Sequence, residues 1–134
     1  MINKYFLEEP NILDLSKEIF NAVVDENLKI ETRFELISKK IEDAETINFI
    51  LADGLGFSNL QSTDSYLNEH INNVVNTTFP SSTNVALTTI AMQANPIDHG
   101  VFSYYMYDKL KYGLINALNW NSENKNLLLS KYFN

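Results

Sequence analysis

Apolar side chains recur at helical spacing in several stretches of the chain. Between residues 11 and 26 they fall at intervals that place them on one face of a helix, and the run from residue 85 to residue 92 is also helical in pattern. Thr32 is followed three residues later by Glu35, which has the form of a capping box before a further periodic run. We therefore predict helices over residues 11–26, 32–43 and 85–92, packed against a core.

Other stretches have the character of β-strands. Residues 46–52, with the sequence TINFILA, are short, nearly all apolar, and rich in β-branched and aromatic side chains. This composition is typical of a strand that is buried on both faces in a parallel sheet. Residues 73–79 predict a second strand, which ends at Pro80. The remaining expectations are a short helix followed by a loop over residues 58–70, a strand or hairpin near residues 114–118 after an aromatic stretch, and a helix over residues 125–132.

The alternation of helices and apolar strands predicts an α/β fold with a mainly parallel sheet and flanking helices. We expect residues 1–45 to form a helical region that packs on the sheet. Residues 46–134 would then form the α/β domain itself. A chain of 134 residues is long enough for one compact unit overall.

Composition narrows the classes of function. The chain carries 17 acidic and 10 basic side chains, a net charge of -7, which disfavours binding to nucleic acids and to anionic membranes. It contains no cysteine, so a metal ion would be held by oxygen and imidazole ligands. The first ten residues lack the apolar stretch of a signal peptide, and we expect a cytoplasmic protein.

Asp53 directly follows the first predicted strand and precedes Gly54 and Gly56. The carboxyl end of a strand is where ligands bind in open α/β sheets, and glycines permit a close approach of the backbone. Asp53 is therefore a candidate metal ligand. The alternative is that Asp-Gly is simply a turn dipeptide. A dinucleotide-binding loop is disfavoured, because Asn59 occupies the position of the third glycine.

Thr83 follows the second predicted strand and stands at the expected start of a helix. The N-terminus of a helix favours a phosphate group and an ionised hydroxyl, so Thr83 is a candidate nucleophile. A threonine hydroxyl is weakly nucleophilic near neutral pH and would need activation by a metal ion. The alternative is that Ser82 or Thr83 only caps the helix.

Four sequence stretches occur in a characteristic order: FILADGLGF at residues 49–57, TFPSSTN at 78–84, ALTT at 86–89 and NPIDHGV at 95–101. Together they resemble the type I phosphodiesterase/nucleotide pyrophosphatase group of the alkaline phosphatase superfamily. The segment GLINALNW at residues 113–120 is similar to the stretch that follows in bacterial members. The resemblance covers about residues 47–120 and implies the N-terminal half of an alkaline-phosphatase-like domain.

The resemblance implies roles for individual residues. Asp53 matches the first aspartate ligand of the family, and Thr83 matches the threonine that contacts metal and attacks phosphorus. By its position, Asn84 is a candidate for binding a nonbridging phosphate oxygen. His99 matches a histidine that is usually structural, and metal ligation by it is the less favoured alternative. The complete enzyme would hold a divalent metal pair, two zinc ions, and would hydrolyse a phosphodiester or a nucleotide.

The resemblance also implies that part of the site is missing. The aspartate and histidine ligands that complete the metal sites of the family do not occur after Trp120. We therefore expect a fragment or a truncated chain whose complementing C-terminal chain supplies them, or a homo-oligomer, because half a sheet leaves an unpaired edge. The competing hypothesis is a catalytically inactive binding or regulatory domain derived from the same fold. The aromatic run of residues 102–107 could form one wall of a substrate pocket, although packing explains it equally well.

Overall fold

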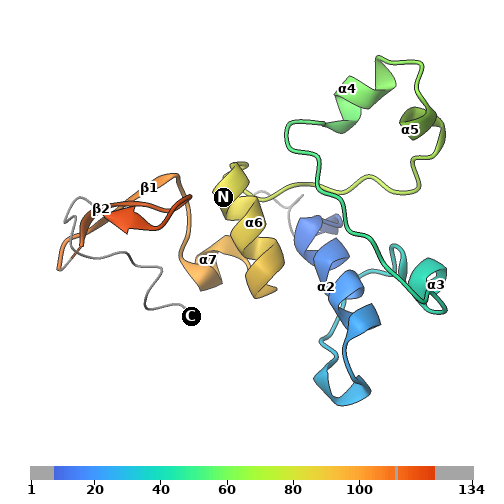
Figure 1. The fold of residues 1–134 in the computed structure, drawn as a ribbon, viewed down its shortest axis with the longest axis horizontal. Helices are drawn as coiled ribbons and strands as arrows, with labels where there is room; N and C mark the ends of the chain where they lie inside the picture. Colours follow the sequence, from blue (N-terminus) through green and yellow to red (C-terminus); the bar gives the residue numbers. More distant parts are fainter. Residues whose placement is uncertain (1–7, 111, 123–134) are drawn as a thin grey trace. The chain divides into compact units, whose positions relative to one another are not determined.

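The computed structural model describes residues 8–110 and 112–122, and the chain divides after Asn76 into two compact units. The division falls within the part that the sequence assigns to the second domain. The elements are helices α2 (Ile12–Val23), η1 (Glu26–Leu28), α3 (Ser38–Ile41), α4 (Phe57–Gln61), α5 (Tyr66–Glu69), α6 (Thr83–Met92) and α7 (Pro96–His99), and strands β1 (Tyr105–Asp108), β2 (Gly113–Asn116) and β3 (Asn121–Ser122) (Figure 1).

Helix α2 of the first unit confirms the helix predicted over residues 11–26, and a capping box fixes its start. The amides of Leu13 and Asp14 donate to Asn11 Oδ1 at 2.9 and 3.4 Å, and Asp14 Oδ2 accepts from the Asn11 amide at 2.9 Å. These bonds satisfy N–H groups that a helix cannot pair within itself. The capping box therefore fixes Asn11 as the N-cap residue and Ile12 as the first residue of α2.

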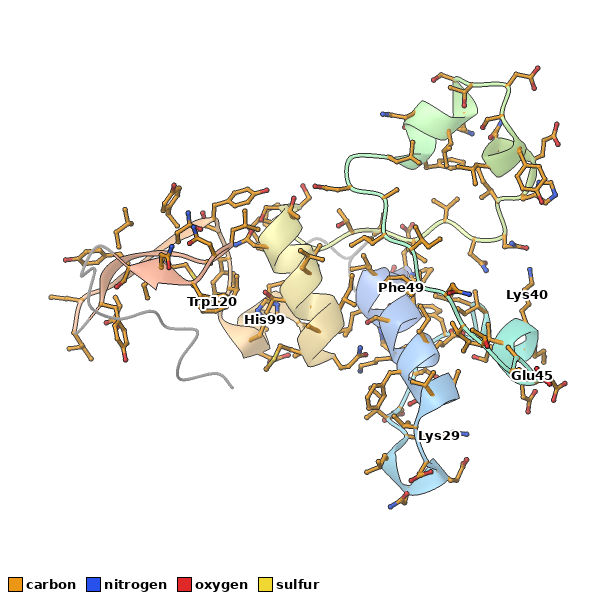
Figure 2. The ribbon with its side chains drawn as sticks, in the orientation of Figure 1. Lys29, Lys40, Glu45, Phe49, His99 and Trp120 are labelled. Carbon is orange, nitrogen blue, oxygen red and sulfur yellow. The ribbon has the colours of Figure 1, made fainter. Side chains whose placement is uncertain are left out.

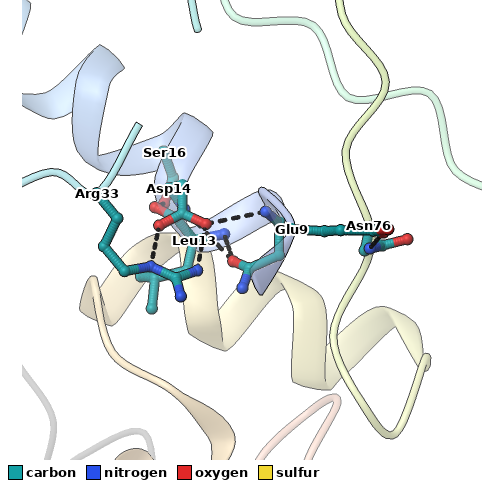
Figure 3. Close-up of polar contacts among 7 residues, drawn as sticks. Glu9, Leu13, Asp14, Ser16, Arg33 and Asn76 are labelled. Atoms are coloured by element: carbon teal, nitrogen blue, oxygen red, sulfur yellow. Dashed lines mark hydrogen bonds and ion pairs between the residues drawn. The ribbon is translucent and has the colours of Figure 1, made fainter. Parts of the chain in front are cut away.

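Polar side chains of α2 hold the chain that follows it. Arg33 donates to both carboxylate oxygens of Asp14, from Nε at 2.8 Å and from Nη2 at 2.6 Å (Figure 3). The guanidinium of Arg33 has a raised pKa because of this hydrogen-bonded pairing with Asp14. Two turns further along α2, the side chain of Asn21 exchanges two hydrogen bonds with the backbone of Ile30, at 2.8 and 2.9 Å. The segment after η1 is thus attached to α2 at several points.

Glu18 makes the densest of these attachments. Its buried carboxylate accepts from the amides of Leu36, Ile37 and Ser38 at 2.5, 2.7 and 2.8 Å, and from the Ser38 hydroxyl at 2.7 Å. Burial raises the pKa of Glu18, but the hydrogen bonds from Ile37, Ser38 and Leu36 outweigh burial and hold it below its ordinary value. The negative charge of Glu18 is therefore stabilised in the folded chain.

The helix predicted over residues 32–43 is wrong for most of its length, because only Ser38–Ile41 (α3) is helical. Arg33 is directed to Asp14, and the amides of residues 36–38 donate to Glu18. A helix begun at Thr32 would need the amides of residues 36–38 for its own backbone bonds. The carboxylate of Glu18 takes these donors and delays the helix until Ser38.

The apolar segment, residues 46–52, is the largest departure from expectation. It links α3 to α4 as a drawn-out stretch, on which Phe49 is labelled in Figure 2, and has no strand assignment. No backbone hydrogen bond joins residues 46–51 to the rest of the described chain. Its apolar side chains are solvent-exposed except for the half-buried Ile47, and Ile50 reaches 85% exposure. A strand needs a neighbouring strand to pair with, and none lies beside this segment among the described residues of the first unit.

The second predicted strand, residues 73–79, is also wrong as a regular strand. Asn76 alone forms an isolated parallel bridge with Asn11, in which the Ile12 amide donates to Asn76 O at 2.8 Å and the Asn76 amide donates to Pro10 O at 2.9 Å. No parallel sheet is present in the described residues. The predicted α/β fold with a mainly parallel, alkaline-phosphatase-like sheet is therefore corrected to short helices with one small antiparallel sheet.

The second unit contains that sheet, whose strand order is β1-β2-β3. Tyr105 pairs with Asn116 and Asp108 with Gly113, and β2 continues into an antiparallel pairing with β3. The strand or hairpin predicted near residues 114–118 is confirmed here. Gly113, at the start of β2, has a φ of 66°, a value that glycine adopts without strain.

The core of the second unit joins the sheet to α6. Its buried members are Val85, Val101 and Ala117, and Met106 and Trp120 pack against them. Helix α6, whose residues were predicted to be helical, contributes Val85, which has 0% exposure. The sheet and the loop before it are thereby fixed against the first turn of α6.

Two further expectations concern other segments. The predicted short helix and loop over residues 58–70 correspond to two short helices, α4 and α5, separated by a turn. The helix predicted over residues 125–132 lies outside the described residues. Within the described part of the chain, no helix has the length and apolar character needed to cross a lipid bilayer.

Candidate functional site

Asp53 lies in the first unit, immediately after the apolar segment. Asp53 and Gly54 form a turn in which the Leu55 amide donates to the Ala52 carbonyl at 3.4 Å. Gly54 has a φ of 74°, in the left-handed region that favours glycine. The turn accounts for the Asp-Gly sequence, and it leaves the Asp53 side chain on the exposed surface of the first unit.

Thr83 lies in the second unit as the first residue of α6. Ser82 is the N-cap residue, but its side chain makes no capping hydrogen bond and instead donates to Asn84 Oδ1 at 2.9 Å. The Thr83 side chain is half-buried, and its Oγ1 accepts a hydrogen bond from the Tyr104 hydroxyl at 3.0 Å. The start of α6 therefore carries a hydroxyl that is oriented by a second hydroxyl.

Asn84 connects the start of α6 to the loop before β1. Its side chain is buried, and Nδ2 donates to the Ser103 carbonyl at 2.6 Å while Oδ1 accepts from Ser82. The amide thus holds Ser103, and with it the neighbouring Tyr104, close to Thr83. These contacts give Asn84 a structural function in the described chain, and phosphate binding by Asn84 stays a prediction.

His99, the last residue of α7, is held by both ring nitrogens (labelled in Figure 2). The Val101 amide donates to Nδ1 at 3.1 Å, so Nδ1 is an acceptor and Nε2 carries the proton that faces Thr89 Oγ1 at 3.0 Å. Burial lowers the pKa of His99, against smaller opposite effects of Asp98 and the backbone. In this arrangement the ring links α7 to α6, and no ring lone pair is left for a metal ion.

The chain matches no protein-family model, no curated protein and no solved structure in the comparisons made with each. Inferences about function therefore depend on the contacts that the described residues make with one another.

A zinc site requires at least three protein ligands. The described residues contain no group of three or more histidine, aspartate or glutamate side chains placed to hold a metal ion. Asp53 belongs to the first unit and Thr83 to the second, and their approach to a common ion stays a prediction. The described residues thus show no complete set of ligands for a catalytic metal ion.

Tyr104 makes a contact with Thr83 that the sequence does not predict. From the sequence, the aromatic run from residue 102 to residue 107 is a candidate pocket wall whose members are not distinguished from one another. In the structure Tyr104 contacts Thr83, whereas Tyr105 and Tyr107 lie in β1 with exposed side chains. Strand alternation does not identify Tyr104, because this residue precedes β1. Its position is set by two hydrogen bonds, one from the Asn84 side chain to the Ser103 carbonyl and one from the Ala117 amide to the Tyr104 carbonyl at 2.8 Å.

Proposed function

We propose that this chain carries the nucleophile of a metal-dependent phosphoric ester hydrolase of the phosphodiesterase/nucleotide pyrophosphatase type, with Thr83 as the nucleophile. The contact that supports the proposal is the hydrogen bond from the Tyr104 hydroxyl to Thr83 Oγ1, at the first residue of a ten-residue helix. The order of motifs around Asp53, Thr83 and His99 supports it from the sequence.

The reaction is a displacement at phosphorus. Thr83 Oγ forms a bond to phosphorus, the bond from phosphorus to the leaving alcohol breaks, and the proton of the threonine hydroxyl ends on that alcohol. Water then cleaves the phosphothreonine ester and restores the hydroxyl. The N-terminal end of α6 favours the negative charge of the phosphoryl group, and Tyr104 fixes the direction of the attacking oxygen. The family resemblance implies a divalent metal ion that would lower the pKa of this hydroxyl, and it assigns Asp53 as one of the ligands of that ion.

The test is the trapping of a covalent intermediate. The purified chain is incubated with an aryl phosphodiester in zinc or manganese, and aryl alcohol release and the intact protein mass are measured. We expect an adduct on Thr83 that is absent from Thr83→Ala and reduced in Asp53→Asn. Ser81→Ala is the matched control, because Ser81 is an exposed hydroxyl two residues before Thr83 and outside α6. Adduct formation that survives in Thr83→Ala would eliminate this assignment.

Tyr104→Phe tests the contact that supports the proposal. The substitution keeps the ring and removes only the hydroxyl that donates to Thr83. A hydrogen bond of this kind contributes about 0.5–1.5 kcal/mol, so we expect adduct formation to slow by a factor of roughly 2 to 10. Tyr105→Phe, an exposed neighbour in β1, serves as the control and should leave the rate unchanged.

The competing proposal is a catalytically inactive binding or regulatory domain. The observation that favours it is the exposure of the apolar segment, since contiguous apolar surface marks a site of association. The two proposals differ in one measurement. An inactive binding domain forms no adduct on Thr83 under any metal condition.

A further inference from the structure

We propose that the apolar segment, residues 46–52, is a docking strand that pairs with the open sheet edge of a different polypeptide, one whose edge strand is flanked by lysine or arginine. The inference goes beyond the proposed function, and it holds whether or not Thr83 is a nucleophile.

The backbone of the segment indicates the kind of partner. No backbone hydrogen bond joins residues 46–51 to the described chain, although the sequence has the β-branched and aromatic composition of a strand. Backbone N–H and C=O groups that leave water must be paired, and a strand pairs them with another strand. A flat apolar surface or a helix groove would bury the side chains and leave these groups unpaired. A sheet edge therefore fits better than either.

The side chains indicate that the docked strand is covered on both faces. In a strand, Ile47, Phe49 and Leu51 lie on one face, and Ile50 lies on the other. All but Ile47 are exposed in the described chain. Burial of apolar area stabilises association by about 25 cal/mol per Å². Each face thus contributes to binding once the partner covers it.

Charge distinguishes a different polypeptide from a second copy of this chain. Four acidic residues lie at or near the ends of the segment, Glu42, Asp43, Glu45 and Asp53. No lysine or arginine occurs between Lys40 and Lys109, so the acidic character extends well beyond the segment. The whole chain carries a net charge of -7. A partner with basic flanks would therefore be attracted to both ends of the strand.

Self-pairing would oppose like charges. In an antiparallel pair of two copies centred on Phe49, Glu45 of one copy would face Asp53 of the other. In a parallel pair in register, Glu45 would face Glu45 and Asp53 would face Asp53. Like charges directly opposite each other destabilise a sheet. The segment therefore favours a basic partner over itself.

The test uses synthetic peptides and the full chain. One fluorescent peptide has alternating valine and threonine with two lysines at each end, and a second has the same centre with two glutamates at each end. Binding is followed by fluorescence anisotropy at about 0.15 M salt. We expect the lysine-ended peptide to bind at least about tenfold more tightly, a difference of about 1.4 kcal/mol. Failure of both peptides to bind would overturn the proposal.

A pair of matched variants separates strand docking from simple charge attraction. Ile50 and Ile97 are isoleucines with 85% and 80% exposure, and Ile97 lies in α7 of the second unit. Ile50→Asp adds negative charge but places a carboxylate on a face that docking would bury, so we expect binding of the lysine-ended peptide to weaken at least about tenfold. Ile97→Asp adds the same charge and should leave binding unchanged. Tighter or unchanged binding to Ile50→Asp would show attraction without docking and contradict the proposal.

Two further readouts complete the test. Hydrogen exchange should slow at the amides of residues 47–51 when the lysine-ended peptide is added, because strand pairing engages their N–H groups. Unchanged exchange at these amides would contradict strand pairing. In sedimentation of the chain alone, we expect Ile50→Asp to leave the oligomeric state unchanged. Association abolished by that substitution would assign the segment to a second copy instead.

Discussion

Two segments of the first unit lack regular structure but differ in how their backbone is satisfied. Residues 30–37 are attached to α2 through Asp14, Glu18 and Asn21. The side chains of these three residues bind Arg33 and the amides of Ile30, Leu36 and Ile37. The apolar segment, residues 46–52, has no such attachment and exposes its side chains. Polar side chains on one helix can thus replace a sheet as the partner of a backbone, whereas no described side chain pairs with the backbone of residues 46–51.

Removal of the Glu18 carboxylate should have the largest effect on the difference between the two segments. Glu18→Ala leaves the amides of Leu36, Ile37 and Ser38 without their acceptor, and we expect the free energy of unfolding of the first unit to fall by about 2–3 kcal/mol. Urea denaturation followed by circular dichroism measures this. Glu35→Ala is the matched control, because Glu35 is an exposed carboxylate whose pair with Lys39 spans 3.4 Å and contributes little.

In the apolar segment, the corresponding substitution should change stability little. Ile50→Ala removes apolar atoms that are already in water, and we expect a change within about 0.5 kcal/mol. A loss comparable to that of Glu18→Ala would mean that the segment is packed in solution, and it would remove the contrast between the two regions.

Hydrogen exchange compares the same two segments without any substitution. The amides of Leu36, Ile37 and Ser38 donate to a buried carboxylate, whereas those of residues 47–51 donate to no described acceptor. We expect exchange at residues 36–38 to be slower by a factor on the order of 10 to 100, equivalent to about 1.4–2.8 kcal/mol. Equal rates in the free chain would contradict the described attachment.

Lowering the pH should weaken the attachment of residues 36–38 to Glu18, and we expect this to be the smallest of the four effects. The pKa of Glu18 is lower in the folded chain than its ordinary value of 4.5, so its stabilising contribution is present above about pH 4.5. That contribution is lost as the pH falls through the lowered pKa, because the unfolded chain takes up the proton first. Urea midpoints measured from neutral pH down to about pH 3 should decline, and Glu18→Gln should decline less. An identical decline in both proteins would assign the acid effect to other carboxyl groups.

Helices were predicted better than strands because their hydrogen bonds are local. The patterns over residues 11–26 and 85–92 needed only nearby residues, and both helices formed. The hairpin of β1 and β2 formed because its two strands are separated by a short turn. The apolar segment had the correct composition for a strand, but pairing depends on a neighbour that the pattern itself does not specify. The helix over residues 32–43 failed because Glu18, distant in sequence, competes for its first amides.

In the candidate site, as in the fold, the features that depend on neighbouring residues were predictable and those that depend on distant residues were not. The turn at Asp53 and the helix that begins at Thr83 follow from local signals, namely Asp-Gly and a polar run before periodic apolar residues. The contact of Tyr104 with Thr83 depends on Asn84 holding Ser103 and on Ala117 holding the Tyr104 carbonyl. These bonds join residues 13 to 21 positions apart, and no periodicity in the sequence indicates them.

The bridge between Asn11 and Asn76 has a consequence for the order of folding. Asn76 pairs with the backbone on both sides of Asn11, so the two ends of the first unit meet only when nearly all of its length is present. Closure of a long loop costs conformational entropy, and the hydrogen bonds of the bridge offset this cost only once the loop has closed. During synthesis, α2 and its attachments can form on the nascent chain well before Asn76 emerges from the ribosome. The apolar segment emerges in that interval, when chaperones would meet it first.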